Sequence, residues 1–278
     1  MRRAFAGIAL AALGFHVAQL QFGILSGSLG ELLDVGLYHA LLGAAAIGCL
    51  ARAYLHRRDR LAWALVGLGL SAWSAAEVYW PLALADLDSP PYPSLAYAGW
   101  LVIYPTSYAA VLLLTRSARA RVPAATWLDG AIAATGASAL AAALLFEPIL
   151  AAATEGDAIV IATNMAYPVG DLVLLALVAG AFGLDGWRPD RRWVLLGAGL
   201  AASAMADSWY LATLAKGTYS EASVLNALWP AAALLMAAAA WQPGRRRSAS
   251  RGGWRLISVP VASPSSASHC SSTTTSIA

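Results

Sequence analysis

Charged residues are scarce in this sequence of 278 residues. Asp, Glu, Lys and Arg together make up 12% of the chain, whereas 59% of it is hydrophobic. Soluble domains carry about twice that share of charge, so the composition excludes a water-soluble enzyme and a disordered chain. Cysteine is scarce too, and Cys49 and Cys270 are too few for a disulfide framework. The low charge points to a lipid bilayer as the solvent.

Long apolar runs are what the sequence has in place of charge. A helix needs roughly 20 apolar residues to cross a hydrocarbon core of about 30 Å. Eight runs meet that length, at residues 4–25, 35–55, 61–83, 95–115, 126–152, 158–183, 192–215 and 223–242. The first run is long enough to span and is followed by no clean small-residue cleavage site, so we interpret it as an uncleaved anchor. We predict an all-α integral membrane protein with an eight-span domain at residues 1–242.

The connectors between these runs alternate in charge. All but one of the 18 Lys and Arg residues fall on one face, and only Lys216 falls on the other. The residues of the basic face are Arg2, Arg3, Arg52, Arg57, Arg58, Arg60, Arg116, Arg119, Arg121, Arg188, Arg191, Arg192, Arg245, Arg246, Arg247, Arg251 and Arg255. Cytoplasmic loops collect Lys and Arg, so we predict a multi-pass protein of the bacterial inner membrane with both termini in the cytoplasm. Topology explains the basic clusters, so we expect lipid and no nucleic acid as partner.

Two sets of residues recur along the chain. The third run matches the seventh at an offset of 130 residues, which pairs Glu77 with Asp207. An aromatic residue followed by proline recurs in the even-numbered runs, as Tyr104–Pro105, Tyr167–Pro168 and Trp229–Pro230, with Tyr38–His39 further upstream. Internal repeats are common in membrane folds. We therefore predict four helical hairpins repeated in the same orientation.

Five acidic residues fall inside the apolar runs, and no Lys or Arg lies deep enough to pair with them. They are Glu77, Asp129, Glu147, Asp171 and Asp207. An ionisable group in a membrane is costly, so such groups face the bundle interior and are often functional. The alternative is that they join helices by hydrogen bonds worth about 0.6 kcal/mol each.

Polar residues on one face of the sixth run suggest where a ligand would bind. Asn164, Tyr167 and Asp171 follow helical spacing, and Tyr104 of the fourth run aligns with Tyr167. We predict a ligand or proton pocket, with interhelical packing as the alternative. Its candidate residues are Tyr104, Glu77, Glu147, Asn164, Tyr167, Asp171 and Asp207.

Catalytic signatures are missing from the sequence, so we expect no enzyme activity, no catalytic residue and no cofactor. His39 with three of the acids offers ligand types for a cation, but no metal-binding spacing supports it, and we predict no metal site. The segment 168–171 is similar to the GxGD motif of intramembrane aspartyl proteases, without the first glycine. That chemistry needs two aspartates sharing a proton. Helical rise predicts Asp207 and Asp129 to lie on the order of 10 Å from Asp171 in depth, which disfavours a protease.

Several segments together resemble a known family. They are Trp127–Gly130, Ala162–Leu172, Gly183–Arg188, Ala206–Leu211 and Ala227–Pro230. Over roughly residues 35–262 the chain resembles the multi-span N-terminal region of actinobacterial GGDEF/EAL diguanylate cyclase/phosphodiesterase proteins. The resemblance implies a sensory input region whose cytoplasmic domains make and break cyclic di-GMP, with no defined ligand.

The chain departs from that family after the membrane domain. Residues 243–278 are first basic and then rich in Ser and Thr, a composition that cannot bury a core. We interpret them as a disordered cytoplasmic tail, or as the product of a frameshift that removed the output domains. We expect a sensory domain of a cyclic-di-GMP-type signalling protein without catalytic output, which signals through a second copy or a cytoplasmic partner. The alternatives are a small-solute or proton-coupled transporter and an intramembrane aspartyl protease.

Overall fold

The computed structural model describes residues 2–117, 132, 135–136, 158–184, 187–220 and 222–244, and within these ranges every regular element is a helix. The helices are α1 (Arg2–Phe22), α2 (Ser28–Leu55), α3 (Arg60–Ala83), α4 (Leu95–Leu101), α5 (Ile103–Ser117), α7 (Ala158–Leu184), α8 (Arg191–Ala215), the 3₁₀ helix η1 (Val224–Ala227) and α9 (Leu228–Ala240). The prediction of an all-α chain is confirmed for these residues. The predicted fifth span, 126–152, and nearly all of the predicted tail lie outside the described residues.

Six helices of the described part are long and apolar enough to cross a membrane. They are Phe5–Phe22, Ser28–Leu55, Arg60–Ala83, Leu95–Ser117, Ala158–Leu184 and Arg191–Leu214. The last predicted span is a shorter apolar helix, Val224–Ala240. A multi-span membrane protein is therefore supported, and the count of eight stays a prediction.

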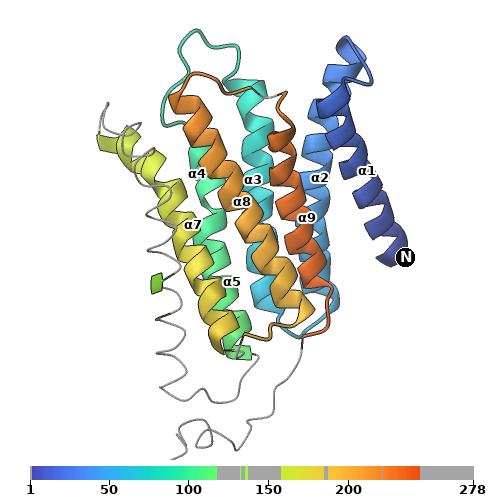
Figure 1. Ribbon diagram of the computed structural model, residues 1–278, viewed down its shortest axis with the longest axis vertical. Coiled ribbons are helices and arrows are strands. Elements are labelled where there is room, and N and C mark those ends of the chain that lie inside the picture. Colours follow the sequence, from blue (N-terminus) through green and yellow to red (C-terminus); the bar gives the residue numbers. More distant parts are fainter. Residues whose placement is uncertain are drawn as a thin grey trace, which may run out of the picture.

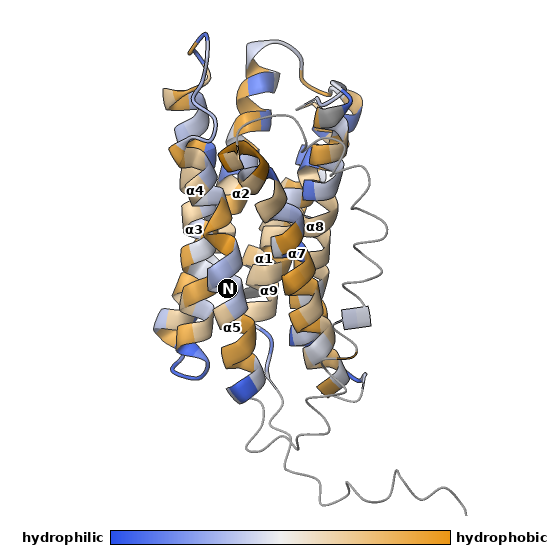
Figure 2. Ribbon diagram, turned by 90° about the vertical axis from the view of Figure 1, so that its left-hand side faces the viewer, coloured by the Kyte–Doolittle hydropathy of each residue, from blue (hydrophilic) through white to orange (hydrophobic). Residues whose placement is uncertain are grey.

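The helices form a closed ring in chain order. α2 packs on α3, α3 on α5, α5 on α7, α7 on α8 and α8 on α9, and α9 returns to contact α2 (Figure 1). α1 lies outside this ring, against α2 and η1. A bilayer explains the outer surface, which is apolar around the bundle and hydrophilic mainly at its two ends (Figure 2).

Proline breaks two of the predicted spans. A proline leaves the carbonyl four residues earlier without its helical hydrogen bond. The fourth span is interrupted at Val102, between α4 and α5, just before Pro105. The last span begins as the 3₁₀ helix η1 before Pro230, whereas α7 continues through Pro168. Both interruptions lie on the side of the ring that borders the site described below.

Two glycines that the 130-residue offset pairs allow neighbouring helices to approach closely. A Cβ atom on Gly69 would lie 2.3 Å from Thr106 Oγ1 of α5, and one on Gly199 would lie 2.8 Å from the Ala232 carbonyl oxygen of α9. Small residues at helix interfaces are typical of membrane bundles. α3 and α8 thus use equivalent positions to pack against their neighbours.

The second helix begins earlier than its hydropathy predicts. α2 starts at Ser28, after Gly27 at φ 71°, whereas the apolar run starts at residue 35. Backbone hydrogen bonding continues past the apolar part of the sequence, so Glu31 and Asp34 belong to a helix and not to a loop. This extension places both carboxyl groups at the end of the bundle where α2 begins and α3 ends, which is called the acidic end below.

A buried ion pair joins the start of α3 to the start of α8 at the opposite end of the bundle, which is called the basic end below. Arg192 Nη1 lies 2.8 Å from Asp59 Oδ2, and both side chains are almost fully buried. Asp59 precedes α3 in a left-handed conformation with φ 56°. At the same end Arg52 donates from Nε to the Ala240 carbonyl at 2.9 Å, which ties α2 to α9. The basic end is therefore held by charged side chains from three parts of the chain.

Breaking the ion pair is expected to destabilise the bundle. Removing one member of a buried pair costs about 3–5 kcal/mol, and without Arg192 the Asp59 carboxylate keeps only the longer contact to Arg58 Nε at 3.7 Å. Arg192→Met should lower the thermal unfolding temperature of the chain in detergent, and Asp59→Asn combined with it should recover part of the loss. Arg191→Met, at the exposed neighbouring position, is the control. Equal unfolding temperatures for Arg192→Met and Arg191→Met would contradict this account of the basic end.

Candidate functional site

A cavity of about 550 Å³ lies at the acidic end of the bundle, opposite the ion pair. Its volume is in the range of small-molecule sites. α1, α2, α3, α4, α5, α7, α8, η1 and α9 all contribute residues to its wall. The carboxyl groups that line it are Glu31, Asp34, Glu77 and Asp207, and no Lys or Arg is among the described residues of the wall.

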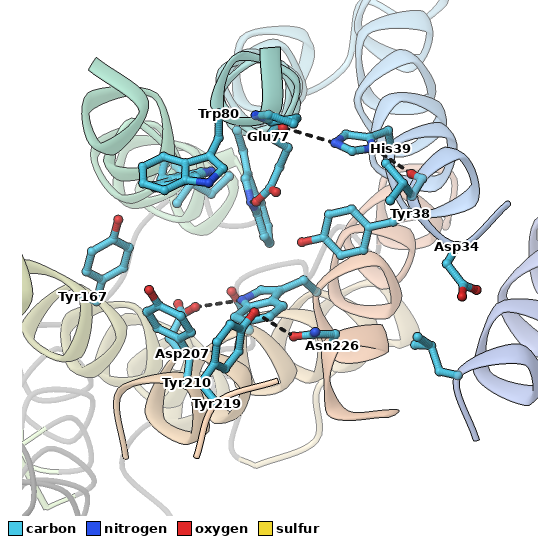
Figure 3. Close-up of a pocket in the computed structure, with 18 of the residues that line it drawn as sticks. Asp34, Tyr38, His39, Glu77, Trp80, Tyr167, Asp207, Tyr210, Tyr219 and Asn226 are labelled. Carbon is cyan, nitrogen blue, oxygen red and sulfur yellow. Dashed lines mark hydrogen bonds between the residues drawn. The ribbon is translucent and has the colours of Figure 1, made fainter. Parts of the chain in front are cut away.

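Glu77 enters the cavity from α3. It is half-buried, and Trp73 one turn earlier donates from Nε1 to its Oε1 at 3.1 Å. Tyr38 of α2 also points its hydroxyl group toward this carboxyl group (Figure 3). The backbone carbonyl of Glu77 lies 3.2 Å from Nε2 of His39, whose Nδ1 lies 2.6 Å from the Val35 carbonyl. These contacts fix the carboxyl group without using all of its lone pairs.

Asp207 enters the same cavity from α8. Trp229 of α9 donates from Nε1 to its Oδ1 at 2.8 Å, and the Tyr104 hydroxyl lies 3.2 Å from its Oδ2. The two acids that the sequence repeat pairs thus each accept a hydrogen bond from an indole. Figure 3 shows Glu77 and Asp207 facing each other across the cavity.

Tyr104 also connects Asp207 to Asp171. Its hydroxyl lies 3.2 Å from Asp171 Oδ1 and 3.2 Å from Asp207 Oδ2, so one phenol oxygen contacts both carboxyl groups. A phenol carries one proton and donates to one acceptor at a time. A proton on either carboxyl group would turn the remaining contact into a second hydrogen bond. Asp171 is buried, its Oδ2 has no donor among the described residues, and it is not part of the cavity wall.

The predicted separation in depth between Asp171 and Asp207 is wrong. Asp171 lies 13 residues from Leu184, the basic end of α7, and Asp207 lies 16 residues from Arg191, the basic end of α8. That difference of three residues corresponds to about 5 Å of helical rise. The long side chain of Tyr104 reaches both carboxyl groups across this difference in depth. The boundaries of the apolar runs alone predict too large a separation.

Gly170 explains how Tyr104 reaches this position. A Cβ atom on Gly170 would lie 2.5 Å from Cδ1 of Tyr104, so only glycine lets the phenol ring lie against α7. Tyr108, one turn further along α5, donates to the Gly170 carbonyl at 3.0 Å. The glycine before Asp171 therefore serves the packing of a tyrosine, and its similarity to a protease motif has this structural cause.

The structure brings together most of the predicted site residues. Glu77, Tyr104, Tyr167 and Asp207 line the cavity, and Asp171 contacts Tyr104 from behind the wall. Asn164 is not in the wall, and its side-chain oxygen accepts a hydrogen bond from the Tyr92 hydroxyl. Burial raises the pKa of the Tyr92 phenol, which keeps it a donor. Glu147 and Asp129 lie outside the described residues.

Two groups of aromatic residues flank the acids, and no spacing in the sequence predicts that they belong to the same site as the acids. The first aromatic cluster consists of Trp80, Tyr92, Tyr97 and Trp100, with ring centroids 4.8–6.4 Å apart between neighbours. The second aromatic cluster consists of Trp209, Tyr210, Tyr219 and Trp229, at 4.9–6.4 Å. Three members of each cluster line the cavity. The signal for these clusters in the sequence is an aromatic pair shortly after each acid, Tyr79–Trp80 after Glu77 and Trp209–Tyr210 after Asp207.

His16 of α1 is a further residue of the wall that hydropathy did not reveal. The sequence predicts a packing histidine in the middle of a span. In the structure it is 2% exposed, and neither ring nitrogen has a partner among the described residues. Its ring centroid lies 6.3 Å from that of Tyr38. Within the same ranges no group of three or more His, Cys, Asp or Glu residues is arranged to hold a metal ion.

Comparison of the chain with family models, curated proteins and solved structures found no match. The resemblance to GGDEF/EAL input regions therefore stays a prediction.

Loss of the Tyr104 hydroxyl is expected to uncouple the two aspartates. Tyr104→Phe keeps the ring against Gly170 and removes the donor that buried Asp171 shares with half-buried Asp207, at about 1–3 kcal/mol. The thermal unfolding temperature in detergent should fall, and combining the change with Asp171→Asn should cost less than the sum of the two. Tyr54→Phe, at an exposed tyrosine of α2, is the control. Strict additivity would show that Tyr104 and Asp171 do not act together.

Proposed function

We propose that the chain is a membrane-embedded sensory domain of a cyclic-di-GMP-type signalling protein. The observation that carries this proposal is a ligand-sized cavity confined to one end of the bundle. Its wall includes Tyr219 and Ala222 in the connector between α8 and η1 at the acidic end. Toward the basic end the interior is filled by fully buried side chains, among them Trp63, Leu114 and Met236. Such a cavity admits a ligand at one end, and among the described residues the interior toward the other end is packed with side chains.

The sorting of charge supports the orientation that a sensor of this type needs. Of the described Lys and Arg residues, those in or beside the helix ends that hold the Asp59–Arg192 pair are Arg52, Arg57, Arg58, Arg60, Arg116, Arg188, Arg191 and Arg192. In our proposal this end faces the cytoplasm of a bacterial cell, together with both termini. The cavity then faces the exterior, where a stimulus arrives.

The mechanism follows from how α3 and α8 are held. Glu77 and Asp207 face each other across the cavity near one end of these helices, and Asp59 and Arg192 join the same two helices at the other end. A ligand that draws the two carboxyl groups together tilts α3 relative to α8 about the ion pair. Because the tilt pivots at the ion pair, it changes the angle between the two helices at the cytoplasmic face without separating their ends, and a partner or an output domain reads that angle.

The four-hairpin repeat is part of the same proposal. The aromatic residues that recur in the even-numbered spans, Tyr38, Tyr104, Tyr167 and Trp229, all line the cavity. Convergence of repeat-related positions on one site is typical of membrane folds built from repeats. In our proposal the repeat accounts for the four aromatic residues that line the cavity.

The two alternatives fit the site less well. A transporter would use the same intramembrane acids, but in the described part of the chain the interior between the cavity and the basic end is filled by side chains. An aspartyl protease needs two aspartates that share a proton, whereas here the Tyr104 hydroxyl lies 3.2 Å from each carboxyl group. Asp171 is also shut off from the cavity, where a peptide would have to enter.

Flux measurements distinguish a sensor from a carrier. Proteoliposomes that contain the full chain should not take up protons faster than empty liposomes, as followed with a pH-sensitive dye in the lumen. They should not take up radiolabelled choline, a small organic cation, faster than empty liposomes either. The packed interior toward the basic end is the physical reason. Saturable uptake that Asp207→Asn abolishes would identify a carrier and overturn the sensory proposal.

The link to cyclic di-GMP is tested at the gene. We expect the genomic DNA after codon 278 to encode GGDEF-type sequence in one of its reading frames, because the family that the membrane domain resembles continues into output domains. A downstream region with no such frame would remove the cyclic-di-GMP part of the proposal and leave the membrane domain as the input of some other partner.

A further inference from the structure

The chemistry of the cavity wall identifies a class of ligand. We propose that the cavity binds an organic cation, a substituted ammonium group carrying apolar substituents. The inference names the ligand class of the proposed sensor and uses the same cavity, but it concerns binding alone and does not depend on any signalling output.

Charge is the first argument. Four carboxyl groups line the cavity, against two imidazoles and no Lys or Arg among the described residues of the wall. Glu77 and Asp207 are half-buried and line the cavity, and their donors are neutral indole and phenol groups that leave any negative charge uncompensated. Carboxylates in a low-dielectric site without Lys or Arg attract a cation strongly. A positively charged ligand between them supplies the counter-charge that the protein lacks.

The aromatic lining is the second argument, and it separates an organic cation from a metal ion. Trp80, Tyr97 and Trp100 border the cavity on one side, and Tyr210, Tyr219 and Trp229 border it on the other. Faces of tryptophan and tyrosine bind quaternary and substituted ammonium groups through cation–π attraction. Metal ions instead require three or more convergent ligands, and no such group exists among the described residues.

Volume and an unpaired imidazole are the third argument. About 550 Å³ is far more than a bare ammonium ion fills, so apolar substituents have to occupy the space. His16 lies in the wall with both ring nitrogens unpartnered among the described residues, although it is almost completely buried. A buried polar group without a partner is uncommon. A polar group on the far end of the ligand, such as a hydroxyl, provides one.

Binding of choline to the full chain in nanodiscs tests this inference. Choline should quench or shift tryptophan fluorescence saturably, and calorimetry should give a matching affinity. Its uncharged carbon isostere, dimethylbutanol, has the same shape and should bind at least about tenfold more weakly. Glu77→Gln and Asp207→Asn should each weaken choline binding by about tenfold or more, and Trp80→Leu should weaken choline more than the isostere.

Matched variants outside the cavity control for general effects of lost charge or ring. Asp88→Asn removes an exposed acid at the same end, and Trp187→Leu removes an exposed tryptophan; both should bind choline as the original chain does. Circular dichroism confirms that each variant is folded. Equal binding of choline and its isostere, no binding of choline or benzyltrimethylammonium, or equal losses in control and cavity variants would overturn the cation inference. None of these results bears on proton or choline flux or on the downstream gene, so the sensory proposal is judged separately.

Discussion

The structure depends on how it satisfies acidic side chains inside a bilayer without any basic residue beside them. A carboxyl group there has to find hydrogen-bond donors within the protein. The chain supplies indole and phenol groups, with Trp73 beside Glu77, Trp229 beside Asp207 and Tyr104 between Asp207 and Asp171. These donors are aromatic, so the same residues that satisfy the acids also build the wall of a cavity. Acid and aromatic residues are therefore one feature of this molecule.

The opposite end of the bundle uses the other solution to the same problem. Asp59 and Arg192 neutralise each other in a buried pair, which joins the start of α3 to the start of α8. One end of the α3–α8 pair is closed by a salt bridge, and the other end is held apart with two carboxyl groups facing a cavity. This asymmetry gives the helices a fixed end and a responsive end, which is the arrangement that a ligand-driven change in tilt requires.

The sequence predicted the helices and most of the site because both leave periodic signals. Apolar runs gave seven of the predicted spans to within a few residues, apart from the early start of α2, and the 130-residue offset paired Glu77 with Asp207, which line one cavity. Hydropathy failed where backbone hydrogen bonding extends a helix beyond the apolar run, as at Glu31 and Asp34. It also failed where side-chain length decides a contact, because Tyr104 joins two aspartates that residue counting separated. The burial of His16 depends on how α1 packs against the ring, which composition does not encode.

The central claim is that a ligand draws α3 and α8 together at the acidic end while the ion pair holds them at the basic end. Pulsed electron resonance on spin-label pairs tests it in the full chain with both native cysteines replaced by serine. One pair, at the exposed positions Leu82 and Leu214, reports the acidic end, and a second pair, at Leu61 and Val194, reports the basic end. With saturating choline the account predicts a shorter distance for the first pair and an unchanged distance for the second. Unchanged distances at the acidic end, or equal changes at both ends, would contradict it.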